Sequence, residues 1–366
     1  MANANSTQTG AVPRSTGPTD PVDVRWRFET AAGHRTFVGA ATTDTVFVGS
    51  SDTAVYALDA ATGSERWRFE TPTGETRPTA LTNDTLYVGS DDTNVYAVDL
   101  ATGTERWRFT EATDRTEAPA VGTVTRSSSP QYENAPWTTP RSTDASDIVI
   151  VSSGDGSVYA LDAVTGEEHW RFDKPADATS TPTVVNGTAF VGSADTKLYA
   201  VSMATGEDRW QFDDATNPTS LPAVAGRTVY ITSLNNILYA VNAVTGKKRW
   251  RFKQGTDWMS DPMIADGNVY VGRGPVDTSV HALNAMTGEE RWRFEKPRSG
   301  TVFMSAAAGT VYIGNADTTM YAVDAATGVE RWRFEASTDM SIPSAVVGET
   351  LYVGSDIPDG TVYALV

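Results

Sequence analysis

Short apolar runs separated by polar turns repeat along the whole chain. The clearest copy covers residues 55–69, in which Val55–Leu58 is apolar at every position, a polar turn follows, and Trp67 and Phe69 then alternate with arginines. The uninterrupted run predicts a strand covered on both faces, and the alternating run predicts a strand with one buried face. Near-copies begin at Val95, Val158, Leu198, Leu238, Val280 and Met320. The repeated unit is therefore a pair of strands joined by a tight turn.

The turn in this unit has residues suited to its geometry. Asp59 follows the first strand, where its carboxylate can accept hydrogen bonds from backbone N–H groups just ahead of it. Gly63 supplies a positive φ at no steric cost. Because a lone hairpin is only marginally stable, we expect each unit to bury its tryptophan and phenylalanine against a neighbouring unit.

The tryptophans give the length of the repeat. The eight tryptophans that belong to this motif occupy positions 26, 67, 107, 170, 210, 250, 292 and 332, so the successive spacings are 41, 40, 63, 40, 40, 42 and 40 residues. A period near 40 residues with four short strands per unit is typical of a β-propeller blade. A helical repeat would need apolar residues at i, i+3, i+4 and i+7, and that pattern is absent. The fold class is therefore all-β.

The two ends of the chain predict a closed ring. The first tryptophan motif, Arg25–Phe28, has no partner strand before it, and the last apolar strand, Val362–Leu365, has no tryptophan strand after it. Pairing these segments would complete an eighth blade and leave no bare sheet edge, whereas an open solenoid would carry atypical capping repeats. We predict an eight-bladed β-propeller with four antiparallel strands per blade, in which the N-terminal strand is the outer strand of the last blade.

Two segments depart from the repeat. Residues 1–20 are polar and rich in Thr, Asn, Gly and Pro, which predicts a disordered tail, and residues 21–366 then form one propeller domain. The spacing of 63 residues contains roughly 23 extra residues, placed at 125–146 between the first two strands of blade 3. Long loops are usually functional or disordered. The Ser, Pro and Thr content of this insertion favours disorder, and its Trp137 favours a packed cover or a partner contact.

Acidic residues outnumber basic ones by 46 to 29, which gives a net charge of −17, and only six of the basic residues are lysines. This charge argues against binding to nucleic acid, which requires a basic surface, and to anionic membranes. Charge of one sign weakens the compact state in dilute buffer, and salt screens it. We interpret the acidic surface as halophilic, with a merely acidic mesophilic surface as the alternative.

Cysteine is absent, which excludes disulfides, thiolate metal sites and a cysteine nucleophile but indicates no compartment. The chain has neither an apolar span long enough for a transmembrane segment nor a signal-peptide core. An extracellular or cell-surface location is favoured if a signal was removed, and a cytoplasmic one otherwise. We expect a monomer with a protein partner or a small-molecule ligand.

In a propeller, the loops that enter each innermost strand surround one mouth of the central channel. The residue two positions before the Pro or Phe of that strand is a hydroxyl residue in six of the eight blades: Thr76, Ser180, Ser220, Ser260, Thr301 and Ser341. Such hydroxyls can form hydrogen bonds with water or with backbone groups at strand ends and need have no role in ligand binding. Arg35 and Glu117 occupy this position in the other two blades.

Other residues on the same face are candidates for ligand contact, because arginines suit bidentate carboxylate binding and an indole can stack on a planar ligand. The predicted ligand-binding residues are Arg35, Arg77, Glu117, Trp258, Asp261 and Arg298. Asp257, Asp261 and Glu117 are a second candidate set, for a hard cation that prefers oxygen ligands. The alternative is that arginines and carboxylates neutralise each other across the rim. We predict no catalytic residue, since no Ser-His-Asp set, phosphate loop or zinc pattern is present.

The motif Ala-Leu-Asp-Ala-Ala-Thr-Gly-x-x-x-Trp-Arg-Phe resembles the repeat of propellers of the pyrroloquinoline quinone (PQQ) type, and its seven full copies and split eighth cover nearly the whole chain. The resemblance implies eight blades locked by tryptophan docking, in which each indole packs against the Thr-Gly turn region of an adjacent blade. The docking residues would be Trp26, Trp67, Trp107, Trp170, Trp210, Trp250, Trp292 and Trp332.

The family that the chain resembles has two functional kinds. Quinoprotein dehydrogenases bind PQQ with calcium or a lanthanide on the axis, whereas proteins that resemble the BamB scaffold, and sensor propellers attached to kinases, keep the fold without the cofactor. Catalytic specialisation normally breaks repeat symmetry at several blades, and the repeats here are nearly ideal. We therefore predict a non-catalytic binding or scaffold propeller that engages a protein or small ligand at its mouth or rim. The alternatives are a PQQ- or metal-dependent (calcium or lanthanide) oxidoreductase and a purely structural ring.

If the acidic surface is a salt adaptation, the melting temperature should rise with potassium or sodium chloride well into the molar range, because salt screens the repulsion among surface carboxylates. Thermal unfolding followed by circular dichroism across a salt series measures this dependence. A flat or falling curve would contradict the halophilic interpretation.

Overall fold

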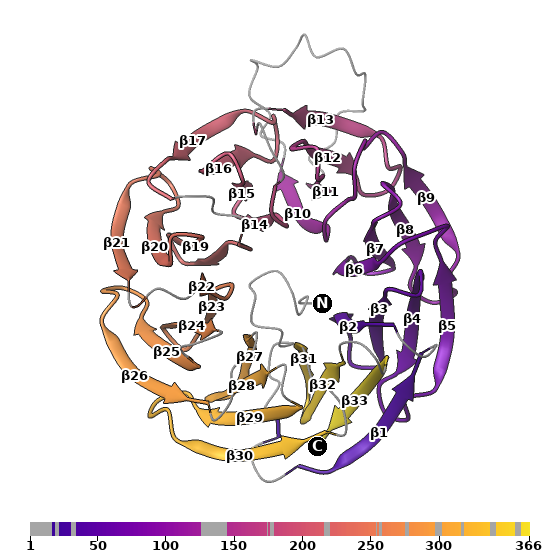
Figure 1. The fold of residues 1–366 in the computed structure, drawn as a ribbon. Coiled ribbons are helices and arrows are strands. Elements are labelled where there is room, and N and C mark those ends of the chain that lie inside the picture. Colours follow the sequence, from indigo (N-terminus) through magenta and orange to yellow (C-terminus); the bar gives the residue numbers. More distant parts are fainter. Residues whose placement is uncertain are drawn as a thin grey trace.

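The structure is a computed structural model that describes residues 17–18, 22–30, 34–125, 145–173, 175, 179–215, 220–253, 255, 258–274, 278–296, 302–315, 318–336, 342–355 and 360–366. In this part of the chain, the strands form eight antiparallel sheets that stand around a common axis (Figure 1). The prediction of an all-β propeller with eight blades is confirmed.

Each of the first five blades runs from an inner to an outer strand in sequence order. Blade 1 contains β2 (Thr36–Ala41), β3 (Thr45–Ser50), β4 (Ala54–Asp59) and β5 (Glu65–Glu70), and blade 2 contains β6 (Thr76–Leu81), β7 (Thr85–Ser90), β8 (Val95–Asp99) and β9 (Glu105–Phe109). Blade 3 contains β10 (Ala120–Thr125), β11 (Ala145–Ser152), β12 (Val158–Asp162) and β13 (Glu168–Phe172). Blade 4 contains β14 (Thr183–Val185), β15 (Thr188–Ser193), β16 (Lys197–Ser202) and β17 (Asp208–Phe212), and blade 5 contains β18 (Ala223–Ala225), β19 (Thr228–Ser233), β20 (Ile237–Asn242) and β21 (Lys248–Lys253).

Blade 6 differs from this plan because two short inner strands pair with the same neighbour. These are β22 (Trp258–Met259) and β23 (Met263–Ala265), both beside β24 (Asn268–Gly274), followed by β25 (Ser279–Asn284) and β26 (Glu290–Glu295). Blade 7 is regular, with β27 (Val302–Ala307), β28 (Thr310–Asn315), β29 (Thr319–Asp324) and β30 (Glu330–Glu335). Blade 6 is therefore the five-stranded sheet of the described ring.

Blade 8 is built from both ends of the chain, as predicted. It contains β31 (Ile342–Val347), β32 (Thr350–Gly354) and β33 (Thr361–Leu365), and β1 (Val24–Glu29) pairs with β33 as the outermost strand (Figure 1). Trp26 lies opposite Ala364 in this pair, and the backbones of Asp23 and Val366 exchange hydrogen bonds of 3.0 and 3.1 Å. This pairing closes the ring.

The repeated turn has the predicted chemistry. Asp59 Oδ1 accepts hydrogen bonds from the backbone N–H groups of Ala61 (3.0 Å) and Thr62 (2.9 Å), and Gly63 has a φ of 72°. In the preceding strand, Val55–Leu58 is fully buried, as an uninterrupted apolar run predicts.

Each outer strand is fixed to the next blade through its tryptophan. The Trp67 indole N–H donates to the Leu100 carbonyl at 3.0 Å, and a Cβ on Gly103 would lie only 2.7 Å from the indole ring. Equivalent glycines contact the other indoles in the pairs Trp26–Gly63, Trp107–Gly166, Trp170–Gly206, Trp210–Gly246, Trp250–Gly288 and Trp292–Gly328. The docking role implied by the family resemblance is thus present at these seven tryptophans.

The eighth docking position has no turn of its own, because the chain ends fall between β33 and β1. The Pro18 carbonyl takes its place, accepting hydrogen bonds from the Trp332 indole N–H at 3.3 Å and from the Tyr312 hydroxyl at 3.0 Å. Gly17 also donates its backbone N–H to the Gly348 carbonyl at 3.0 Å. The predicted tail of residues 1–20 therefore includes a buried pair that completes the docking ring, and disorder stays a prediction for its other residues, which lie outside the described ones.

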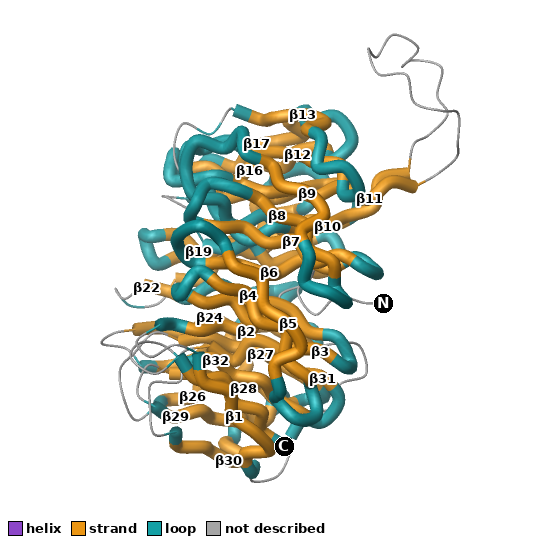
Figure 2. The backbone as a smooth tube through the Cα atoms, turned by 90° about the vertical axis from the view of Figure 1, so that its right-hand side faces the viewer, coloured by secondary structure: helices purple, strands orange, loops and turns teal. Residues whose placement is uncertain are grey.

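The insertion of blade 3 is located where the sequence places it. Its ends continue the ladder between β10 and β11, with Thr125 opposite Ala145, and Figure 2 shows these ends of β10 and β11 projecting from one face of the ring. Residues 126–144, including Trp137, lie outside the described residues. Both interpretations of the insertion remain predictions.

Removing residues 1–20 should destabilise the protein by about 2 kcal/mol or more, because the buried Tyr312 hydroxyl and Trp332 indole N–H would each lose an acceptor. Removing residues 1–16 is the matched control and should have little effect, since Gly17 and Pro18 remain. Denaturant unfolding of the three proteins at the same high salt concentration tests this. Equal stability of the two truncated proteins would show that the Gly17–Pro18 contact contributes nothing.

Candidate functional site

The predicted hydroxyl ring at the channel mouth serves the backbone. Thr76 is buried, and its hydroxyl donates to the Ala54 carbonyl (2.7 Å) and accepts from the Ser50 N–H (3.2 Å) of blade 1. Thr116 and Thr36 make equivalent bonds to their preceding blades. Ser180, Ser220 and Ser260 instead accept backbone N–H groups within their own blades. Thr301 and Ser341 lie outside the described residues. At the described positions the hydroxyls therefore form hydrogen bonds with backbone groups at the ends of strands.

The charged residues at the channel mouth in blades 1 to 3 pair with each other. Arg77 lies 2.8 Å from Asp91 and 3.4 Å from Glu75, and Arg35 reaches Glu75 at 3.9 Å. Glu117 is paired with Arg115 at 3.3 Å. These predicted ligand residues thus form ion pairs along the rim, which was the alternative interpretation, and their role in binding stays a prediction.

The candidate cation site is divided between two parts of the ring. Glu117 enters the mouth from blade 3 and Asp261 from blade 6, while Asp257 and the ligand candidate Arg298 lie outside the described residues. Among the residues that the structure does describe, no three His, Asp or Glu side chains gather closely enough to hold a metal ion. The metal site therefore stays a prediction that depends on Asp257.

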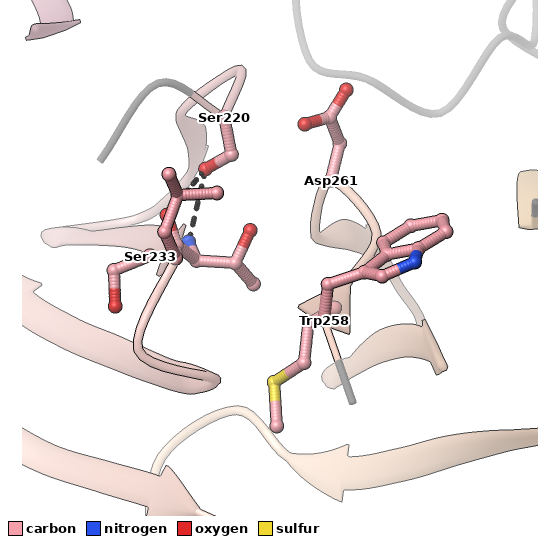
Figure 3. Close-up of a pocket in the computed structure, with 7 residues that line it drawn as sticks. Ser220, Ser233, Trp258 and Asp261 are labelled. Atoms are coloured by element: carbon pink, nitrogen blue, oxygen red, sulfur yellow. Dashed lines mark hydrogen bonds between the residues drawn. The ribbon is translucent and has the colours of Figure 1, made fainter. Parts of the chain in front are cut away.

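Trp258 and Asp261 are the two predicted residues that share a pocket. The pocket has a volume of about 240 Å³ and lies between blades 5 and 6; we call it the blade 5–6 pocket. It is lined by Ser220, Thr232, Ser233, Leu234, Trp258, Met259 and Asp261. Figure 3 shows Ser220 and Ser233 on one side and Trp258 and Asp261 on the other.

Local departures from the repeat build this pocket. In blade 6 the extra strand β22 pairs Trp258 with Gly274 and Met259 with Arg273, which holds the indole beside the mouth. Arg273 is completely buried, although the matching position is Ser50 in blade 1 and Ser90 in blade 2. In blade 5, Leu234 replaces the polar or small residues found at this turn in other blades and is 61% exposed. The repeat is broken on both sides of the pocket.

Asp261 gives the pocket its negative charge. Asp261 is exposed to solvent, yet many protein atoms lie around its carboxylate. The resulting desolvation raises the pKa of Asp261 to about 6, against the opposing effect of a hydrogen bond from the Leu221 N–H. In contrast to Glu75, Asp91 and Glu117, it has no ion-pair partner among the described residues. Above pH 6 the described lining of the pocket therefore carries a net negative charge.

Leu234 and Arg273 were missed by the sequence analysis, although a signal for both was present. When the eight repeats are aligned at the end of the second strand, Leu234 stands where other blades have serine, aspartate, glycine or alanine, and Arg273 stands where they have serine or asparagine.

Comparisons with known proteins agree with this architecture. The family model described as outer membrane protein assembly factor BamB matches residues 23–134, 122–222, 217–308 and 276–365. No curated protein sequence matches the chain. No helix in the described part of the chain is long and apolar enough to cross a membrane.

Similar solved structures include both kinds of propeller considered above. BamB from Moraxella catarrhalis is 17% identical with a TM-score of 0.72, covering 94% of this chain and 97% of its own. The computationally designed Ika8 protein is 17% identical with a TM-score of 0.75, covering 91% and 96%. Quinohemoprotein alcohol dehydrogenase from Comamonas testosteroni is 16% identical with a TM-score of 0.73, covering 98% of this chain and 78% of its own. At these identities the likeness establishes the fold alone.

Proposed function

The chain belongs to the BamB family of propeller repeats, and on that premise we propose that it is a non-catalytic scaffold that binds a protein partner at the blade 5–6 pocket. The observation that carries the proposal is the break of repeat symmetry there. Strong local departures from an otherwise regular pattern are expected at functional sites, and here they place Leu234, Trp258 and Asp261 around one opening.

The composition of this opening supports a protein partner. An exposed apolar side chain, an indole and a carboxylate together resemble the aromatic-rich centre and polar rim of protein interfaces. By contrast, the ion pairs of blades 1 to 3 already satisfy their own charges, so a partner would have to break them. The blade 5–6 side of the mouth is therefore the favoured contact surface.

The oxidoreductase alternative is not supported by the described pocket. PQQ is a planar tricarboxylate, which needs cationic or donor groups, whereas the charged residue lining this pocket is Asp261. Arg35 and Arg77, which could pair with carboxylates, are engaged by Glu75 and Asp91. The described residues therefore do not fit this cofactor.

We also propose that the scaffold works in a salt-adapted cell. The net charge of −17 with only six lysines supports this setting. At high salt, long-range attraction between exposed charges is screened, so a partner interface would need short-range contacts that lose water on binding, such as those offered by the half-buried Trp258 indole and the Asp261 carboxylate beside it.

Photo-crosslinking tests the proposed contact surface. A photoreactive amino acid at position 234 should give a discrete protein adduct in cells that make this protein, and Trp258→Ala should abolish that adduct because it removes the aromatic contact. The control is position 164, which is 83% exposed on the outer turn of blade 3, on the opposite face. The purified partner should then bind the wild-type protein at least about tenfold more tightly than the variant, since buried interface tryptophans are common hot spots.

Adducts of equal yield from positions 234 and 164, or an adduct at 234 that is insensitive to Trp258→Ala, would contradict a partner site at this pocket. The unfolding transition of Trp258→Ala should be measured beside that of the wild type, so that a loss of binding can be separated from a loss of structure.

A further inference from the structure

The blade 5–6 pocket presents hydrogen-bond acceptors and few donors. The Ser220 hydroxyl donates to the Thr232 carbonyl (2.9 Å) and accepts the Thr232 N–H (3.0 Å). Thr232 Oγ1 donates to the Ser260 carbonyl (3.1 Å), and the Ser233 hydroxyl donates to the Ile237 carbonyl (3.1 Å). Because these hydroxyl protons are committed to the protein, the hydroxyls can offer a ligand only their lone pairs.

The remaining polar group of the pocket also accepts hydrogen bonds. The Asp261 carboxylate uses one oxygen for the Leu221 N–H at 3.0 Å, and its other oxygen has no protein partner among the described residues. The Trp258 indole is half-buried and offers a π face to a cation. Its N–H is the one donor among the lining side chains. A ligand that fits this pocket carries a positive charge and several N–H groups.

We propose that the pocket binds the guanidinium group of an arginine side chain, presented by the protein partner proposed above. Arginine fits better than lysine because its planar fork of five donors can stack on an indole while it bonds to a carboxylate. The volume of about 240 Å³ is large enough for an arginine side chain, whose seven non-hydrogen atoms would fill at most about 210 Å³ even at the roughly 30 Å³ that a water molecule occupies.

The apolar lining suits the rest of that side chain. Leu234 and Met259 can cover the aliphatic stem, as apolar surfaces commonly do for arginine, while the guanidinium reaches Asp261. The indole N–H of Trp258 is then available to a backbone carbonyl of the partner. The inference rests on the proposed function for the source of the arginine, but the recognition chemistry can be tested without the partner.

Fluorine NMR of the whole protein labelled with fluorotryptophan tests the inference directly. The Trp258 resonance is assigned with Trp258→Phe and followed during titration with N-acetyl-arginine methylamide, above pH 6 and at high salt. The matched probe is N-acetyl-citrulline methylamide, which has nearly the same shape but no charge. We expect a saturable shift of the Trp258 resonance with the arginine probe and affinity about tenfold weaker or more for the citrulline probe, because hydrogen bonds to charged groups are the stronger ones.

Asp261→Asn identifies the group that recognises the charge. This variant keeps an acceptor for the Leu221 N–H, so it should fold, and it should weaken binding of the arginine probe by about tenfold or more. Asp91→Asn is the matched control, since it removes the same charge from the same mouth at a carboxylate that is already paired with Arg77, and it should leave the affinity unchanged.

Equal binding of the arginine and citrulline probes, equal effects of the two Asn variants, or no saturable shift with the arginine probe would each overturn the inference. None of these results changes the interpretation of the crosslinking experiment, which reports whether a protein occupies the pocket at all. Conversely, specific arginine binding without a crosslinked partner would support the pocket chemistry and contradict the scaffold function.

Discussion

The structure depends on the contact between an indole and the turn of the next blade. Each blade alone is a small sheet with an apolar face on either side, and the outer strand carries the tryptophan that joins it to its neighbour. At the carbonyl of Ala163, the Trp107 indole N–H and the Tyr87 hydroxyl converge at 3.2 and 2.9 Å. Truncating a buried tryptophan in such a contact typically costs about 3–5 kcal/mol. Seven such contacts, together with the hydrogen bond from Trp332 to the Pro18 carbonyl, mean that every blade of the closed ring is held from both sides.

This constraint explains why so much of the fold was predictable. The docking tryptophan, the turn aspartate and the turn glycine are local requirements, so they recur in the sequence at the spacing of the blades. The closure by β1 followed from the same periodicity, because Trp26 and the strand at Val362–Leu365 are the two halves of one unit. The role of Gly17 and Pro18 could not be predicted, because the eighth docking acceptor is supplied by a segment that does not follow the repeat motif.

The candidate site was predictable only in part, for the same reason. Trp258 was selected because an indole near the mouth can stack on a planar ligand, and Asp261 because a carboxylate beside the row of hydroxyls can hold a cation. Arg77 was selected as a possible carboxylate ligand and Glu117 as a possible cation ligand, yet both form ion pairs. The pair of Arg77 with Asp91 depends on how β6 and the turn after β7 approach each other in space, which spacing along the chain does not report, whereas Glu117 pairs with Arg115 two positions away. The pocket lies where two adjacent blades both leave the pattern, and the proposed function rests on these departures from the repeat.

The most direct test of the docking contact is a double-mutant cycle between Trp67→Phe and Gly103→Ala, measured by denaturant unfolding. A Cβ on residue 103 would meet the indole at 2.7 Å, so Gly103→Ala should cost less once the smaller phenylalanine is present. We predict that the double variant loses less stability than the sum of the single variants, with a coupling energy of about 0.5–3 kcal/mol. Losses that add to within about 0.3 kcal/mol, as for independent sites, would contradict the claim that this contact joins the blades.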